Sequence, residues 1–136
     1  MRILGLDVCN SSVAACMLLQ RPSEPRQFYY DAKFERLSAN AEGISRLLSM
    51  APDIAVMEPT GVNYARLWGT HLAGAGMEVR LVGHTQLHTY RAGHLELPDK
   101  DDDADALALA CYCFDYLHSP RRFVQVRDFP ITPFGS

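Results

Sequence analysis

The order in which strand-like and helix-like segments follow one another constrains this chain more than any other feature. Residues 2–8, 13–19 and 27–37 have the apolar, alternating or aromatic character of strands, and no helical segment separates them. Turn-forming residues occupy positions 9–12, between the first two. We therefore predict that the chain begins with an antiparallel meander of three strands.

Helical and strand patterns alternate in the rest of the chain. In chain order, the predicted elements are a helix capped by Asn40, a strand at 54–57, a helix at 63–75, a strand at 79–82, a weaker helix to residue 92 and a strong helix at 101–118. Such alternation predicts a parallel section of sheet. The whole order is that of the RNase H-like fold of the RuvC and retroviral integrase superfamily. This is an α/β fold with a mixed five-stranded sheet, three antiparallel strands and then two parallel ones, flanked by helices.

Size and composition fit a single domain. A chain of 136 residues with 48% hydrophobic content can bury one core but not two. It lacks the run of about eighteen apolar residues that a membrane span needs, so we expect a cytoplasmic protein without a membrane partner. Its four cysteines show neither zinc-site nor disulfide spacing, and we expect them to be reduced. A net charge of −3 disfavours broad non-specific DNA binding, but four acids within 101–105 concentrate that charge where cations could offset it.

Acidic residues occur at three places that this order of elements would bring together. Asp7 and Glu58 end the first and fourth strands, which are neighbours in this topology, so both would lie at one edge of the sheet. Asp102 and Asp105 lie three apart in the first turn of the last helix and can share a face. Asp101, four before Asp105, could face the same side. Periodicity alone does not choose between Asp101 and Asp102.

Carboxylates that converge in this way repel one another unless cations lie between them. Hard oxygen ligands suit Mg²⁺ or Mn²⁺, and two such ions about 4 Å apart can activate a nucleophile and stabilise a leaving oxygen. The predicted chemistry is phosphodiester cleavage or strand transfer. Taken singly, each acid also fits a structural role, as a turn residue after a strand or as an acid at a helix N-terminus.

Four segments resemble the DEDD-type, RuvC-like transposases of bacterial insertion sequences, which are related to the Piv-type DNA invertases. They are residues 5–8 (GLDV), 57–62 (MEPTGV), 76–82 and 100–106 (KDDDADA). The likeness runs from residue 3 to about 118. It implies that Asp7, Glu58, Asp102 and Asp105 are the catalytic metal ligands, and so it favours Asp102 over Asp101.

The same resemblance implies partners and domain organisation. Residues 1–118 would be the catalytic domain, and residues 119–136 an extended tail or the start of a linker to a second domain. In this family the second domain carries a nucleophilic serine for strand exchange. DNA would be the substrate of recombination and transposition, some members use a structured guide RNA, and the full-length protein would be a homo-oligomer. Arg121 and Arg122 are candidate phosphate contacts.

Other interpretations stay open. The length and residues 1–8 also resemble a stand-alone Holliday-junction resolvase-like nuclease of the YqgF kind, with the same fold and ions but a hydrolytic reaction. Residues 6–12 resemble the phosphate-binding hairpin of an actin-like ATPase or sugar kinase, and a non-catalytic interaction module would keep the fold without the chemistry. His84 and His88, four apart, could chelate a metal, but no third soft ligand is evident. We therefore interpret them as surface or supporting residues.

Overall fold

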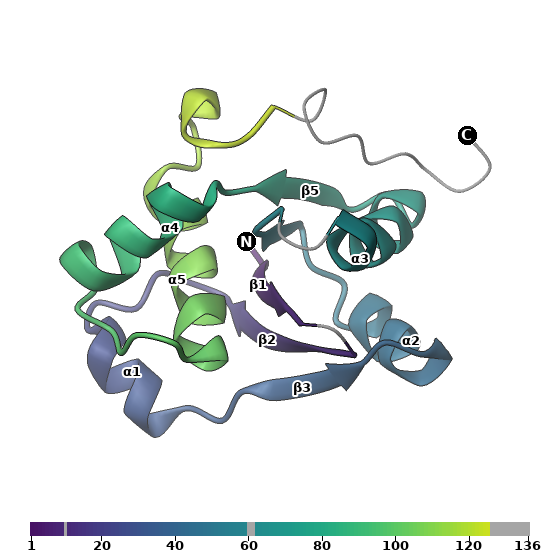
Figure 1. Ribbon diagram of the computed structural model, residues 1–136, viewed down its shortest axis with the longest axis horizontal. Coiled ribbons are helices and arrows are strands. Elements are labelled where there is room, and N and C mark those ends of the chain that lie inside the picture. The colour runs from purple at the N-terminus through teal and green to yellow at the C-terminus, as the bar shows by residue number, and fades with distance from the viewer. Residues whose placement is uncertain (10, 60–61, 126–136) are drawn as a thin grey trace.

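The computed structural model of the protein describes residues 1–9, 11–59 and 62–125, and its centre is one five-stranded sheet (Figure 1). The strands are β1 (Ile3–Val8), β2 (Ser12–Leu18), β3 (Glu35–Ser38), β4 (Ile54–Met57) and β5 (Glu78–Leu81), in the spatial order β3-β2-β1-β4-β5. β1, β2 and β3 pair in antiparallel fashion, while β4 and β5 add to β1 in parallel. The predicted mixed sheet is confirmed.

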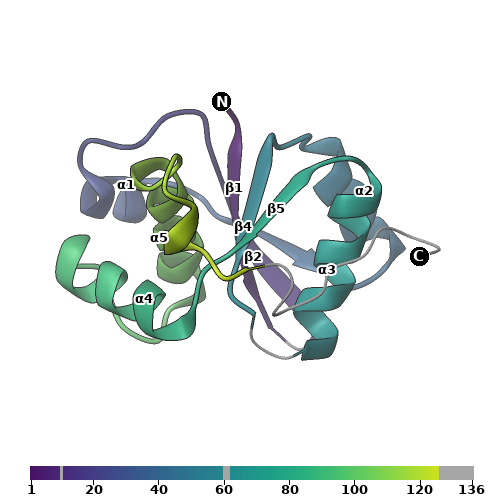
Figure 2. The same ribbon diagram turned by 90° about the horizontal axis from the view of Figure 1, so that it is seen from above.

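Helices cover both faces of this sheet (Figure 2). They are α1 (Pro25–Asp31), α2 (Ala41–Ser49), α3 (Val62–Gly74), α4 (His84–Thr89), which continues as a π-helical turn (Tyr90–His94), and α5 (Asp102–Asp115). Figure 2 shows α2 and α3 on one face and α1, α4 and α5 on the other. Asn40 caps α2 as predicted, because its side chain accepts a hydrogen bond from the Gly43 amide at 2.9 Å. None of the described helices is long and apolar enough to cross a membrane.

The predicted third strand over residues 27–37 is wrong in its first half. Pro25–Asp31 form α1, and only Glu35–Ser38 pair with β2. Pro25 stands in the first turn of the helix, where its missing N–H is not needed. Phe28 and Tyr29 pack against the core beside α5, whereas Tyr30 is 64% exposed. The aromatic residues that suggested a strand therefore belong to a short helix, which packs on the core through Phe28 and Tyr29.

Side chains of the central strands alternate between two hydrophobic clusters. Leu4 and Leu6 of β1 face α2 and α3, where they pack with Trp68 and Leu72. Ile3 faces the other way, toward α5. On β4 the same alternation places Ala55 and Met57 with the first cluster and Ile54 and Val56 with the second.

Helix α5 lies unusually close to β1. A Cβ at Gly5 would lie 2.0 Å from the carbonyl oxygen of Ala106 and 3.0 Å from the amide nitrogen of Ala110, so only glycine fits here. Ala104 and every residue from Ala106 to Cys113 are buried. The small residues of this helix therefore let its backbone pass directly over the end of β1.

After α5, residues 119–125 return to the edge of the sheet at β5. Pro120–Arg122 form a 3₁₀ turn, and Val124 bridges to Leu81 of β5. The Tyr112 hydroxyl donates to the Arg122 carbonyl at 2.6 Å. The remainder of the predicted tail, residues 126–136, lies outside the described residues, and the boundary after residue 118 stays a prediction.

Candidate metal-binding active site

Two of the four predicted acids meet at the carboxyl ends of β1 and β4. Leu6 lies opposite Met57 in the parallel pair, so Asp7 and Glu58 come next along the two strands. Asp7 is two residues from Gly5 and thus faces α5. Glu58 is buried, with 6% of its surface exposed, and its charge helps to raise the pKa of Asp7. Both carboxyl groups therefore belong to one electrostatic cluster.

Asp102 completes a hydrogen-bonded pair with Asp7 across the gap between β1 and α5. Burial, first, and then the hydrogen bond with Asp102 and the charges of Asp105, Asp102 and Glu58 together raise the pKa of Asp7 to about 8. The hydrogen bond with Asp7, aided by Arg36, lowers the pKa of Asp102. The pKa values of the two carboxyl groups therefore move in opposite directions, as expected when more negative charge is gathered than the surroundings can stabilise.

Asp105 belongs to the same cluster but has a fixed partner. Arg91, in the π-helical turn, donates from Nη1 to Asp105 at 2.6 Å and from Nη2 to Asp99 at 2.7 Å. Arg91 is 3% exposed, and its Nε is buried without a hydrogen-bond partner among the described residues. A buried guanidinium held between two carboxylates fixes where the Asp105 side chain points.

Asp101 and Asp103 are engaged elsewhere. Asp101 caps α5 by accepting a hydrogen bond from the Asp103 amide at 3.1 Å, and it also accepts one from the Tyr29 hydroxyl. Asp103 pairs with Arg36 at 3.2 Å, and the same guanidinium reaches Asp102 at 3.1 Å. Asp101 therefore serves the helix end and the docking of α1, while Asp102 faces Asp7.

Cys9 adds a thiol to the Asp7 and Asp102 pair. Its Sγ donates to an Asp102 oxygen at 3.5 Å, and burial raises the pKa of the thiol to about 11. One ligand atom from each of Asp7, Cys9 and Asp102 lies within 4.8 Å of the others. All four cysteines are free thiols, which agrees with their predicted reduced state.

Glu58 also contacts a residue that the sequence had not connected with it. His84 Nδ1 lies 2.5 Å from Glu58 Oε1, and the rings of His84 and His88 lie 4.0 Å apart between centroids. The spacing of His84 and His88 is visible in the sequence, but their contact with Glu58 is not. That contact arises because β5 is the parallel neighbour of β4, so the chain leaves β5 beside the end of β4. Arg91, Arg36 and Cys9 were likewise not identified as neighbours of the acids.

The residues present suit divalent cations. Burial and the charges of three neighbouring carboxylates raise the pKa of Asp7, and a bound cation would offset that effect. Carboxylate oxygens are the ligands that Mg²⁺ and Mn²⁺ prefer. Asp7 and Asp102, together with the Cys9 thiol, are near enough to share one ion.

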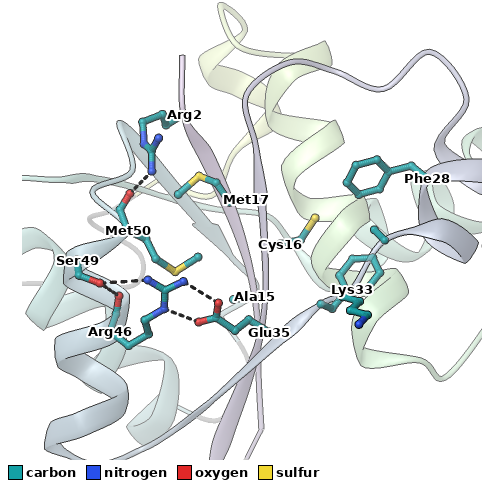
Figure 3. A pocket seen from close by; sticks show the side chains of 12 residues that line it. Arg2, Ala15, Cys16, Met17, Phe28, Lys33, Glu35, Arg46, Ser49 and Met50 are labelled. Atoms are coloured by element: carbon teal, nitrogen blue, oxygen red, sulfur yellow. Dashed lines mark hydrogen bonds and ion pairs between the residues drawn. The ribbon is translucent and has the colours of Figure 1, made fainter.

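One pocket among the described residues lies apart from the four acids. Its volume is about 360 Å³, it lies beside β2 and β3, and none of the four acids lines it (Figure 3). Its charged groups are mostly paired: Arg46 binds Glu35 at 2.8 Å, and Arg2 donates to the Met50 carbonyl at 2.5 Å (Figure 3). The candidate site is instead an open cluster at the end of the sheet.

Comparison with known proteins defines the class of fold. No protein-family model and no curated protein matches the chain. Solved structures do match, and they show an RNase H-like fold, as predicted. Thermus thermophilus RuvC aligns with a TM-score of 0.51 and 16% identity over 86% of this chain and 95% of that chain. T. thermophilus RuvC in complex with a Holliday junction substrate aligns with a TM-score of 0.57 and 16% identity, over 91% and 99%. Likeness to the insertion-sequence transposases stays a prediction.

Proposed function

We propose that this chain is a catalytic domain that cleaves phosphodiester bonds in DNA with divalent cations, Mg²⁺ or Mn²⁺, held by Asp7, Glu58, Asp102 and Asp105. The observation that carries the proposal is the convergence of carboxylates from β1, β4 and α5, where ligand atoms of Asp7, Cys9 and Asp102 lie within 4.8 Å of one another. A cluster so rich in negative charge has a large electrostatic gain from binding cations. Its position at the end of the sheet of an RNase H-like fold supports the same function.

The chain's own residues have distinct roles in this proposal. Two bound cations would activate the attacking oxygen and stabilise the leaving one. Asp7 and Glu58, fixed at the strand ends, would form the rigid part of the site. Asp105 would be oriented by Arg91, and Asp102 would exchange its hydrogen bond with Asp7 for a contact with the cation. Arg36, whose side chain is half exposed, lies where it could meet a DNA phosphate.

Two DNA reactions fit this site, transposition and the hydrolysis of branched DNA, and a different observation supports each. The segments around Glu58 and Asp102 favour the catalytic domain of a DEDD transposase, in which strand exchange, a guide RNA and homo-oligomer formation would involve a second domain. The alignment with almost the whole length of the RuvC chain favours a resolvase that hydrolyses branched DNA without such a domain. We give preference to the transposase domain because its motif residues include all four acids.

Cation binding is tested by titrating the full chain with Mn²⁺ and following the paramagnetic signal of free Mn²⁺. We expect Asp102→Asn to weaken binding by at least about tenfold, because a direct ligand is lost. Asp101→Asn is the matched control, since asparagine caps helices as well as aspartate does. Equal affinities for the wild type and Asp102→Asn would contradict the metal site.

DNA cleavage is tested with linear duplex and with a four-way junction, each in the presence of Mg²⁺. Symmetrical nicks at the junction would favour the resolvase, and joined products from linear ends would favour the transposase domain. Asp7→Asn should abolish either reaction. A chain that binds Mn²⁺ and cleaves neither substrate would contradict the proposed function while leaving the metal site standing.

A further inference from the structure

A second group of metal-binding side chains lies beside the carboxylates, where α4 begins. Glu58, His84 and His88 each offer one ligand atom, and these three atoms lie within 4.8 Å of one another. Ligands that share one zinc ion at about 2.0–2.2 Å lie at most about 4 Å apart. Small rotations of the two imidazole rings are therefore enough to let all three contact a single cation.

The backbone brings these residues together in a fixed way. β5 lies parallel to β4, and the Val82 amide donates to the Met57 carbonyl at 3.0 Å, so the chain leaves β5 next to Glu58. Helix α4 then starts at His84, and His88, four residues on, lies on the same face. The two elements that carry the ligands are thus held together by main-chain hydrogen bonding.

The cluster of Glu58, His84 and His88 is buried on the Glu58 side and open to solvent on the His84 side. The Glu58 side chain is 7% exposed, whereas the His84 side chain is 67% exposed. A buried carboxylate at the base and an exposed imidazole above it leave room for water or a ligand oxygen in the remaining coordination position. Open zinc sites have this arrangement of three protein ligands and one exchangeable position.

We propose that Glu58, His84 and His88 bind a transition-metal cation such as Zn²⁺. Two imidazoles and one carboxylate suit Zn²⁺, whereas Mg²⁺ prefers oxygen ligands. The site differs in this respect from the neighbouring cluster of Asp7 and Asp102, with which it shares the Glu58 carboxylate as a ligand. It does not depend on the proposed nuclease function, since binding requires neither DNA nor Mg²⁺.

The direct test is a titration of the untagged full chain with Zn²⁺ alone, observed through the imidazole nitrogen resonances in NMR spectra. The chain has five histidines, which makes the spectrum easy to assign. We expect the resonances of His84 and His88 to shift at one equivalent of Zn²⁺, and those of His94 and His118 to stay in place.

Variants decide where the ion sits. His84→Ala and His88→Ala should each weaken Zn²⁺ binding by at least about 100-fold, because loss of an outer-shell partner alone costs about 10–100-fold. His118→Ala, which removes an exposed histidine after α5, is the matched control and should bind Zn²⁺ like the wild type. Backbone amide spectra verify that each variant is folded.

Two results would overturn the proposal. One is a set of His84 and His88 resonances that do not move at saturating Zn²⁺. The other is binding that survives both histidine variants and is lost in Cys9→Ser, which would place the ion with Cys9, Asp7 and Asp102.

Discussion

The two faces of the sheet differ in how closely the helices approach the strands. The face covered by α2 and α3 is filled by large side chains, with Trp68, Leu4 and Leu6 fully buried. The face covered by α5 also buries large side chains such as Leu107 and Leu109, but it has small residues where Gly5 lies under Ala106. Large side chains bury more apolar area and stabilise the fold. Small ones let two backbones approach, and that approach brings the first turn of α5 to the end of β1. The close backbone approach and the candidate site therefore lie on the same face, the one covered by α5.

The largest effect is expected from Trp68→Ala on the α2–α3 face. Removal of this fully buried indole should lower the free energy of unfolding by about 3–5 kcal/mol. Urea denaturation measures the loss. Leu67→Ala, at a neighbouring residue that is 36% exposed, should change stability by less than about 1 kcal/mol. Similar losses in both variants would mean that the buried indole contributes no more to stability than an exposed side chain.

Gly5→Ala tests the close approach on the other face. The added methyl would meet backbone atoms of α5, which cannot rotate away, so we expect a loss of about 1–3 kcal/mol or more. Mn²⁺ affinity should fall as well, because α5 and its Asp102 would be displaced from Asp7. Gly93→Ala is the control, since nothing lies within 4 Å of its added Cβ. A Gly5→Ala protein with wild-type Mn²⁺ affinity would show that the approach is not needed for the site.

Asp7→Asn should stabilise the metal-free protein while it abolishes cation binding. The pKa of Asp7 is raised from 3.8 to about 8, so folding takes up a proton and wild-type stability falls as pH rises between these values. Asparagine has no such penalty, and after allowance for solvent screening its advantage should grow to about 1–2 kcal/mol near pH 8. Thermal unfolding in chelator at pH 4 and pH 8 measures the difference. A pH-independent difference would rule out the raised pKa.

The smallest effects are expected at the two helix caps, one on each face. Asn40→Ala should cost about 1 kcal/mol of stability through α2 and leave Mn²⁺ affinity unchanged. Asp101→Ala should cost a similar amount through α5 but also weaken Mn²⁺ binding, because Asp102 and Asp105 stand in the turn that it caps. Denaturation and Mn²⁺ titration of both variants give the comparison. Unchanged Mn²⁺ affinity in both variants would show that the cap of α5 is not needed for Mn²⁺ binding.

The sequence predicted most of the fold because its signals are local. Hydrophobic period, helix caps and turn residues act over a few positions, and they identified the strands at residues 54–57 and 79–82, the cap at Asn40 and the helix that carries Asp102. The element order then implied that β1 and β4 are neighbours, as observed. The local pattern failed at Phe28 to Tyr30, where a contact with α5 decides that the segment is a helix.

By itself the sequence determined which residues carry the charge and on which elements they stand: Asp7 on β1, Glu58 after β4, and Asp102 and Asp105 on α5. Only the tertiary structure decided their partners. Arg91 with Asp105 and His84 with Glu58 are contacts between segments 14 and 26 residues apart. Such contacts depend on how closely α5 packs at Gly5 and where the chain leaves β5, and steric fit across the whole core sets both.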